Sequence, residues 1–157
     1  MSKENEVASY SFLDNTLTIN GPNGSFTIGG PDTGSADEGF DIDFVEDADT
    51  MTPGADGSTM HSLNATKRAG WTLRLLKTSP VNAQLANMYN ADRSAGSQQW
   101  GQNTLTMTNA VSGDSYTGAQ TAFRKFPRNA YAKNANMLEW TFNSGQTDPQ
   151  LGSLTVQ

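Results

Sequence analysis

The sequence predicts a mainly β fold of two packed antiparallel sheets, sandwich-like or barrel-like, with one amphipathic α-helix. Three observations support this prediction. Apolar and polar residues alternate with a period of two in most of the chain, which is typical of half-buried strands. One short segment has helical spacing instead. Gly, Ser, Thr and Asn are abundant while charged residues make up only 17%, and this composition favours turns and strands.

The first expected element is a β-hairpin. Leu17 and Ile19 alternate with polar residues, Gly-Pro-Asn-Gly at 21–24 forms a turn, and Phe26 and Ile28 alternate again. The same alternation predicts further strands at residues 40–44, 71–75, 105–107 and 138–142, and a short one within 151–156.

One segment has the period of a helix, at about residues 79–91. A hydroxyl residue precedes Pro80, which suits the first position of a helix. Val81, Leu85 and Met88 then recur at helical spacing. We expect this apolar stripe to pack on a sheet as part of the core.

Two long segments, 29–38 and 46–62, show no period. Loops longer than about 12–15 residues are uncommon in compact domains and are usually functional or disordered. The second segment and its border carry Met51, Met60 and Leu63, apolar groups that a solvated loop does not need. This predicts an arm that docks on a neighbouring copy, with a mobile surface loop as the alternative.

Size and composition suit a single domain over 1–157, with no internal repeat and no linker. The net charge of −6 argues against general binding to nucleic acid or anionic membranes. The absence of cysteine excludes disulfides and thiolate metal sites, and it fits assembly in a reducing cytosol. The polar N-terminus does not resemble a signal peptide, and no apolar run approaches the roughly 20 residues of a membrane helix.

Charge is divided unevenly along the chain. Residues 4–66 hold twelve carboxylates and no Lys or Arg, whereas residues 67–157 hold nine Lys or Arg and four carboxylates. The two parts therefore pair internally, or the molecule shows opposite signs on different faces. Opposite signs on different faces suit head-to-tail association of copies.

The residues do not assemble an active site. His61 is the one histidine, no Cys is present, and no G-x-S-x-G motif occurs. Asp47, Asp49 and Asp56 do not match the ligand positions of an EF-hand loop, so only a weak cation site of another kind stays open. Phosphate-loop and dinucleotide motifs do not occur. We therefore expect no enzyme activity, no metal and no cofactor.

A basic and aromatic segment stands out in the second part of the chain. Arg124, Lys125 and Arg128 are interleaved with Phe126 and Tyr131. Such a pattern can mark a nucleic-acid surface. Because the chain is acidic overall, we favour contact with the acidic first part, within one copy or between copies.

Four stretches carry a family resemblance. They are residues 10–14 running into the first hairpin, 51–62, 74–82 with 88–90, and 131–133 with 139–142. Together they resemble the tail tube proteins of contractile-tailed bacteriophages, which are myovirus-type virion structural proteins of about this size. The resemblance spans most of the chain and is most specific from 51 to 90.

The resemblance implies a structural subunit. Such proteins form hexameric rings that stack into a hollow tube inside a contractile sheath, and the tube conducts viral DNA into the host. Edge strands join around the lumen, and a long loop reaches the adjoining ring. The implied partners are further copies, the tail sheath protein, baseplate or tail-initiation proteins, the tape measure protein, and DNA in transient non-specific passage. The implied location is the virion, after assembly in the host bacterial cytoplasm, with no membrane insertion by this chain.

Two sets of site residues follow as expectations. A lumen of carboxylates and hydroxyls would let DNA slide, and ordinary solvent exposure is the alternative. The candidate lumen residues are Asp41, Asp43, Glu46, Thr104, Thr106 and Thr108. The candidate inter-subunit residues are Asp47, Asp49, Met51, Asp56, Met60, His61, Arg124, Lys125 and Arg128.

Two other functions stay open. A tube of a pyocin-like or secretion-type contractile apparatus would share the fold and carry no DNA. A monomeric β-module that binds carbohydrate or a host surface is more distant, because Trp71 and Trp140 alternate in phase with core positions. Only Trp100 lies in a polar context.

Overall fold

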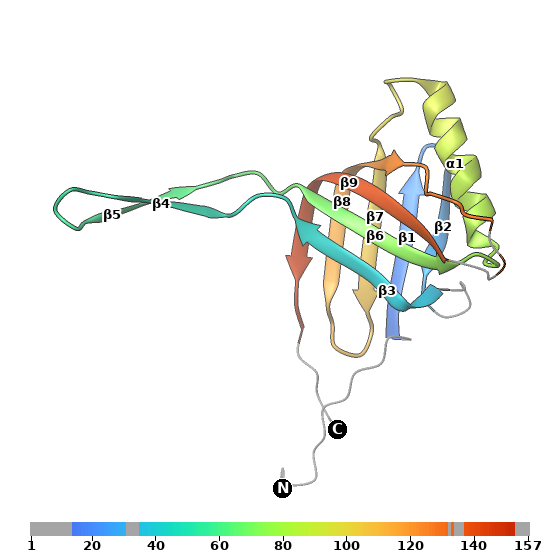
Figure 1. Ribbon diagram of the computed structural model, residues 1–157, viewed down its shortest axis with the longest axis horizontal. Coiled ribbons are helices and arrows are strands. Elements are labelled where there is room, and N and C mark those ends of the chain that lie inside the picture. The colour runs from blue at the N-terminus through green and yellow to red at the C-terminus, as the bar shows by residue number, and fades with distance from the viewer. Residues whose placement is uncertain (1–13, 31–34, 132, 134–136, 153–157) are drawn as a thin grey trace, which may run out of the picture.

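The computed structural model describes residues 14–30, 35–131, 133 and 137–152 (Figure 1). These residues form nine strands and one helix. In chain order the elements are β1 (Asn15–Gly21), β2 (Gly24–Gly29), β3 (Ser35–Phe44), β4 (Asp49–Pro53), β5 (Thr59–Leu63), β6 (Ala69–Leu76), α1 (Val81–Ala95), β7 (Asn103–Asn109), β8 (Ser115–Lys125) and β9 (Met137–Gln150).

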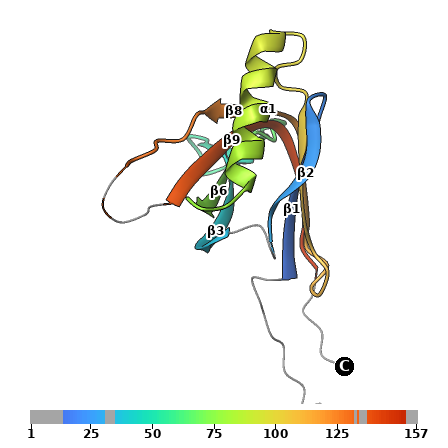
Figure 2. The same cartoon turned by 90° about the vertical axis from the view of Figure 1, so that its right-hand side faces the viewer.

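Seven strands form one antiparallel sheet in the order β2-β1-β7-β8-β9-β6-β3, and β4 pairs with β5 in a separate two-stranded sheet. The large sheet curls so that its two halves face each other, with β1 and β2 on one side and β3 and β6 on the other (Figure 2). The predicted mainly β fold with packed antiparallel layers and one helix is confirmed. The two layers are halves of one continuous sheet, joined through β8 and β9.

The core fills the space between the two halves. Alternate residues are buried along β1, β6 and β7, because successive side chains of a strand point to opposite faces. Leu17, Ile19 and Leu105 contribute from one half, and Trp71 and Leu73 from the other. The residues predicted to face the core from these strands are therefore buried.

Helix α1 covers the open side of the curled sheet (Figure 2). Its buried face includes Val81, Leu85 and Met88, the stripe that helical spacing predicts. The helix begins at Val81, whose N–H donates to Ser79 Oγ at 3.2 Å. It ends at Ala95, and Gly96 leaves the helix with φ 82°, a conformation that glycine adopts without strain. The observed range, 81–95, is shifted toward the C-terminus from the predicted 79–91.

A buried carboxylate ties α1 to the first half of the sheet. Asp92 accepts hydrogen bonds from Asn23 Nδ2 at 2.6 Å and from Asn103 Nδ2 at 2.8 Å. Asn23 lies in the β1–β2 turn and Asn103 begins β7. A side chain at position 21 of β1 would collide with Asn103, so this position requires glycine. Three elements thus converge on one acidic side chain.

Several elements differ from the sequence expectations. The segment at 46–62, which shows no period, contains most of the β4–β5 hairpin. Strand β8 was not predicted, because Gln120 takes a positive φ of 53° and interrupts its alternation. Strand β9 extends to Gln150, well beyond the predicted 138–142. Leu151 and Gly152 are not in a strand, and the rest of the strand predicted within 151–156 lies outside the described residues.

We expect Asp92→Ala to lower the free energy of unfolding by about 1–3 kcal/mol, because the buried amide of Asn103 loses its acceptor. Urea unfolding at a concentration where the protein is monomeric measures this. Asn87→Ala, at an exposed position of the same helix, is the matched control and should stay within about 0.5 kcal/mol. An Asp92→Ala variant as stable as the control would show that the network contributes nothing.

Candidate assembly surfaces

The hairpin of β4 and β5, residues 49–63, is called the arm below. It projects from one end of the body (Figure 1). All residues of both strands are exposed. An isolated two-stranded hairpin is at best marginally stable in water, so this arm is suited to packing against another molecule.

Local hydrogen bonds close the tip of the arm. Gly54 N–H donates to the Ser58 carbonyl at 2.7 Å. Asp56 Oδ1 accepts from the Ser58 hydroxyl at 2.7 Å and from the Ser58 N–H at 3.0 Å. These hydrogen bonds, the hydroxyl first, lower the pKa of Asp56. Asp56 is therefore engaged in the turn, which its short acceptor side chain suits.

The strand register divides the arm into two faces. Directly opposed residues of an antiparallel pair share a face. One face carries Asp49, Met51, Pro53, Thr59, His61 and Leu63, and the other carries Thr50, Thr52, Met60 and Ser62. On the first face Met51 is 66% exposed and Leu63 is 86% exposed. His61 Nδ1 lies 2.7 Å from Asp49 Oδ2 beside them. This face, called the apolar face, thus combines three apolar side chains with the Asp49–His61 pair and Thr59.

A groove of about 750 Å³, called the arm-base groove, opens where the arm leaves the body. Its apolar lining includes Phe44, Leu63, Ala65 and Pro149. Asp47 also lines it. Leu63 belongs both to the groove and to the apolar face of the arm, so the two form one continuous surface.

The outward face of β3, β6 and β9 is acidic. Asp41 and Asp43 alternate with inward residues of β3. Arg74 contacts Asp41 at 2.9 Å and Glu139 at 3.4 Å. Asp43, which lies opposite Gly70 at the other end of β6, forms no ion pair with the described residues. This face therefore carries three carboxylates, of which two contact its guanidinium. Glu46, predicted to share this strand face, lies beyond the end of β3 and pairs with Arg68.

The outward face of the other half of the sheet carries hydroxyl groups. Thr104, Thr106 and Thr108 point outward from β7. In the paired strand, Thr18 lies opposite Thr106 and Thr16 lies opposite Thr108. From β1 and β7 this face has only hydroxyl and amide side chains. The two sets of predicted lumen residues therefore lie on opposite outer faces of one copy (Figure 2).

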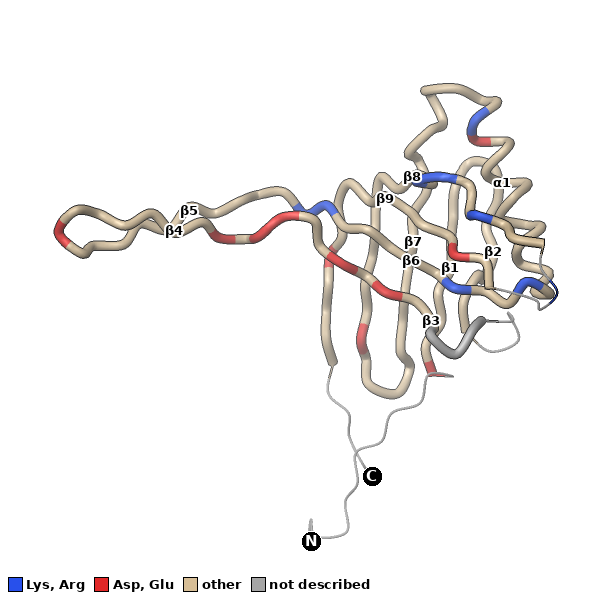
Figure 3. The backbone as a smooth tube through the Cα atoms, viewed as in Figure 1, with Lys and Arg blue, Asp and Glu red and all other residues tan. Residues whose placement is uncertain are grey.

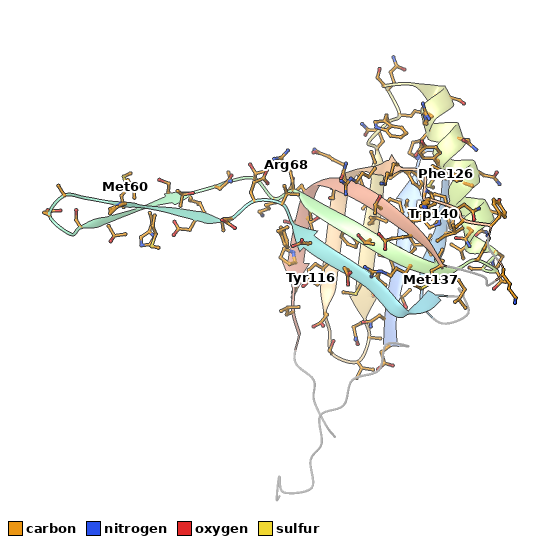
Figure 4. All side chains as sticks on the ribbon, in the orientation of Figure 1. Met60, Arg68, Tyr116, Phe126, Met137 and Trp140 are labelled. Carbon is orange, nitrogen blue, oxygen red and sulfur yellow. The ribbon has the colours of Figure 1, made fainter. Side chains whose placement is uncertain are left out.

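The basic and aromatic segment forms a corner at the end of the body opposite the arm. Figure 4 shows Phe126 at this end and Arg68 beside the arm. The Phe126 ring packs between Tyr89 at 5.5 Å and Trp140 at 5.4 Å and remains 45% exposed. Lys77 Nζ lies 4.1 Å from the centre of the Tyr131 ring, which is 87% exposed.

Three cations accompany these rings. Arg124, Lys125 and Arg128 are exposed and form no ion pair with the described residues. We call Arg124, Lys125, Phe126, Arg128 and Tyr131 the aromatic–basic corner. It combines exposed apolar surface with uncompensated positive charge.

The uneven charge of the sequence is partly paired within one copy. Asp41 with Arg74, and Glu46 with Arg68, join the acidic first part to the basic second part. The remaining charges stay separated in space. Carboxylates follow β3 and the base of the arm, beside the ion-paired Lys67 and Arg68, whereas Arg124 and Lys125, which form no ion pair with the described residues, lie at the end of β8 (Figure 3).

The described residues contain no group of three or more His, Asp or Glu side chains that could hold a metal ion. Asp47 lies at the base of the arm, Asp49 begins it and Asp56 is at its tip, so these three carboxylates do not converge. Among the described residues, no helix has the length and hydropathy needed to cross a bilayer.

Comparisons with known proteins identify a family and a shared fold. The family described as bacteriophage PhiTE tail tube protein matches residues 7–152. A search of curated proteins gave no match. A chain of the anti-feeding prophage cap, which terminates the tube, has a TM-score of 0.51 and 10% identity, covering 97% of this chain and 99% of that one. A chain of the sheath–tube complex of an extracellular contractile injection system (PVC) in its extended state has a TM-score of 0.51 and 14% identity, covering 86% and 88%. At these identities the two solved structures show a shared fold.

We expect Met51→Ala with Leu63→Ala to change the stability of a single copy by less than about 0.5 kcal/mol, because both side chains are exposed. Leu85→Ala with Met88→Ala makes the matched change in the core, and each substitution should cost about 2–5 kcal/mol. Urea unfolding of dilute protein compares the two. An equal loss of unfolding free energy in the two double variants would mean that the arm packs on the body of its own copy.

Proposed function

Because the chain belongs to the family of bacteriophage PhiTE tail tube proteins, we propose that its copies form hexameric rings that stack into a hollow tube inside a contractile sheath. In this proposal the tube conducts viral DNA. The observation that carries it is the arm, which extends from the body with every strand residue exposed. A lone copy has no described surface on which this hairpin packs.

The arm supplies a contact between rings. A contact that joins different surfaces of two copies does not close on itself, so repeating it builds an open filament. Met51 and Leu63 bury apolar area against the next ring, and the other face presents Met60. Asp49 and His61 form a polar pair within the apolar face, opposite Leu63 and Met51, and Asp56 holds the tip closed.

The sheet supplies a contact within the ring. Strands β2 and β3 form the two edges of the seven-stranded sheet. An exposed edge presents unpaired N–H and C=O groups, which a strand of a neighbouring copy can satisfy. Pairing edge strands around a ring would remove those edges, as closure of a barrel does.

We assign the lumen to the acidic face of β3, β6 and β9. DNA is a polyanion, and a basic lining would hold it through release of counterions. Asp41 and Asp43 repel it instead, and Arg74 is compensated by Asp41 and Glu139. The hydroxyl face with Thr104, Thr106 and Thr108 then faces the sheath. The remaining partners in this proposal are the baseplate and tape measure proteins, in a virion assembled in the host cytoplasm.

A second candidate function has its own support. The two similar solved chains come from an anti-feeding prophage and an extracellular contractile injection system. A tube of a pyocin-like or secretion-type apparatus would use the same arm and edge contacts but would not carry DNA. Particles isolated with this protein and tested for packaged DNA separate the two functions.

Removing the arm tests the stacking contact. Thr50 and Ser62 face each other across the hairpin, so Asn-Gly can replace residues 51–61 as a two-residue turn. We expect a folded protein that forms no tubes by negative-stain microscopy under conditions where the unmodified protein does. Normal tubes from the shortened protein would remove the arm from the mechanism. If the unmodified protein forms neither rings nor tubes, even with its tail-initiation proteins, the tube proposal is wrong.

Charge reversal tests the lumen. Asp41→Lys with Asp43→Lys should permit tube formation but slow DNA release from assembled particles by on the order of tenfold, since each added lysine binds phosphate. Thr106→Lys with Thr108→Lys on the opposite face is the matched control and should leave release unchanged. If the threonine variant alone slows release, the lumen belongs to the hydroxyl face.

A further inference from the structure

The arm-base groove has the character of a binding site. Phe44 comes from the end of β3, Leu63 from the end of β5 and Pro149 from the end of β9, so three strands hold its apolar walls. Its volume of about 750 Å³ lies within the range of pockets that bind drug-sized groups, roughly 300–1,000 Å³. Large aromatic side chains fill such pockets effectively.

The charge of the groove is negative. The neighbouring cations are compensated, because Lys67 Nζ lies 3.1 Å from Asp148 Oδ1 and Arg68 pairs with Glu46. Asp47 on the groove forms no ion pair with the described residues. An occupant of this groove should therefore combine an apolar or aromatic group with positive charge.

The aromatic–basic corner has that combination. Phe126 is anchored by two aromatic neighbours and still half-exposed. Lys77 holds Ala130 and Tyr131 in place, because its Nζ donates to the Ala130 carbonyl at 2.7 Å and lies over the Tyr131 ring. A ring held in position before binding loses less entropy on binding, which favours affinity. Tyr and Arg are also the residues that most often dominate binding energy at interfaces.

We propose that the arm-base groove of one copy binds the aromatic–basic corner of the next copy. This inference rests on the proposed tube function and names the surfaces of one of its contacts. The groove and the corner lie at opposite ends of the body (Figure 4). Each copy can therefore use both surfaces at once, and the contact repeats from copy to copy. Asp47 lies opposite Lys125 or Arg128 at its rim, where complementary charge sets orientation and association rate.

Cross-linking tests the contact directly, because the chain contains no cysteine. Ala65→Cys places a thiol in the groove and Asn129→Cys places one in the corner. Tubes of the double variant, oxidised and run on a non-reducing gel, should give a ladder of covalent oligomers. Ala65→Cys with Thr108→Cys is the matched control, since Thr108 lies on the hydroxyl face, and it should stay a single band. Tubes that form without the ladder overturn the groove contact and leave the tube function intact. If neither the variants nor the unmodified protein form tubes, the groove contact and the tube function are both overturned.

A charge swap tests the rim. Asp47→Lys in the cross-linking variant should reduce the ladder about tenfold, and adding Arg128→Glu or Lys125→Glu, whichever residue pairs with Asp47, should restore it. No reduction of the ladder with Asp47→Lys overturns this pairing. Failure of both Arg128→Glu and Lys125→Glu to restore the ladder overturns it as well.

The N-terminal segment of the same chain is the competing occupant of the arm-base groove. Ala65→Cys with Ser11→Cys in dilute, monomeric protein reports it, and we expect no intramolecular disulfide. Rapid formation of that disulfide would assign the groove to the same chain and overturn the proposal.

Discussion

The edges of the sheet and the arm carry backbone and apolar groups that have no partner among the described residues of one copy. Each strand inside the curled sheet has two partners and one buried face, and the core and α1 follow from that arrangement. The arm has neither a second strand partner nor a buried face. Strands β2 and β3 are the two edges of the sheet, and neither has a second strand partner among the described residues. Because unpaired edges and exposed hairpins are unfavourable alone, the fold favours assembly.

Charge adds direction to this assembly. Ion pairs within one copy compensate Arg68 and Arg74, while Asp43, Asp47 and the cations of the aromatic–basic corner have no described partner. These uncompensated negative charges lie toward the arm, and the uncompensated positive charges lie at the opposite end of the body (Figure 3). Opposite signs at opposite ends favour head-to-tail contacts over symmetric pairing of like surfaces.

The sequence predicted those parts of the fold where burial produces a regular pattern. Leu17, Trp71 and Leu105 alternate with polar neighbours because one face of each strand meets the core. The same logic fails on the arm, where no face is buried within the copy and Thr50 through Ser62 show no period. It also fails on β8, where Gln120 breaks the alternation. The separation of Asp41 from Thr106 onto opposite faces depends on strand order, which local patterns do not encode.

Hydrogen–deuterium exchange of the arm measures the central claim most directly. Amides of residues 49–63 should exchange rapidly in a dilute single copy, apart from the pairs within the hairpin. In assembled tubes they should become protected by at least an order of magnitude, because a neighbouring copy covers them. Equal exchange of the arm in the single copy and in tubes would contradict the account.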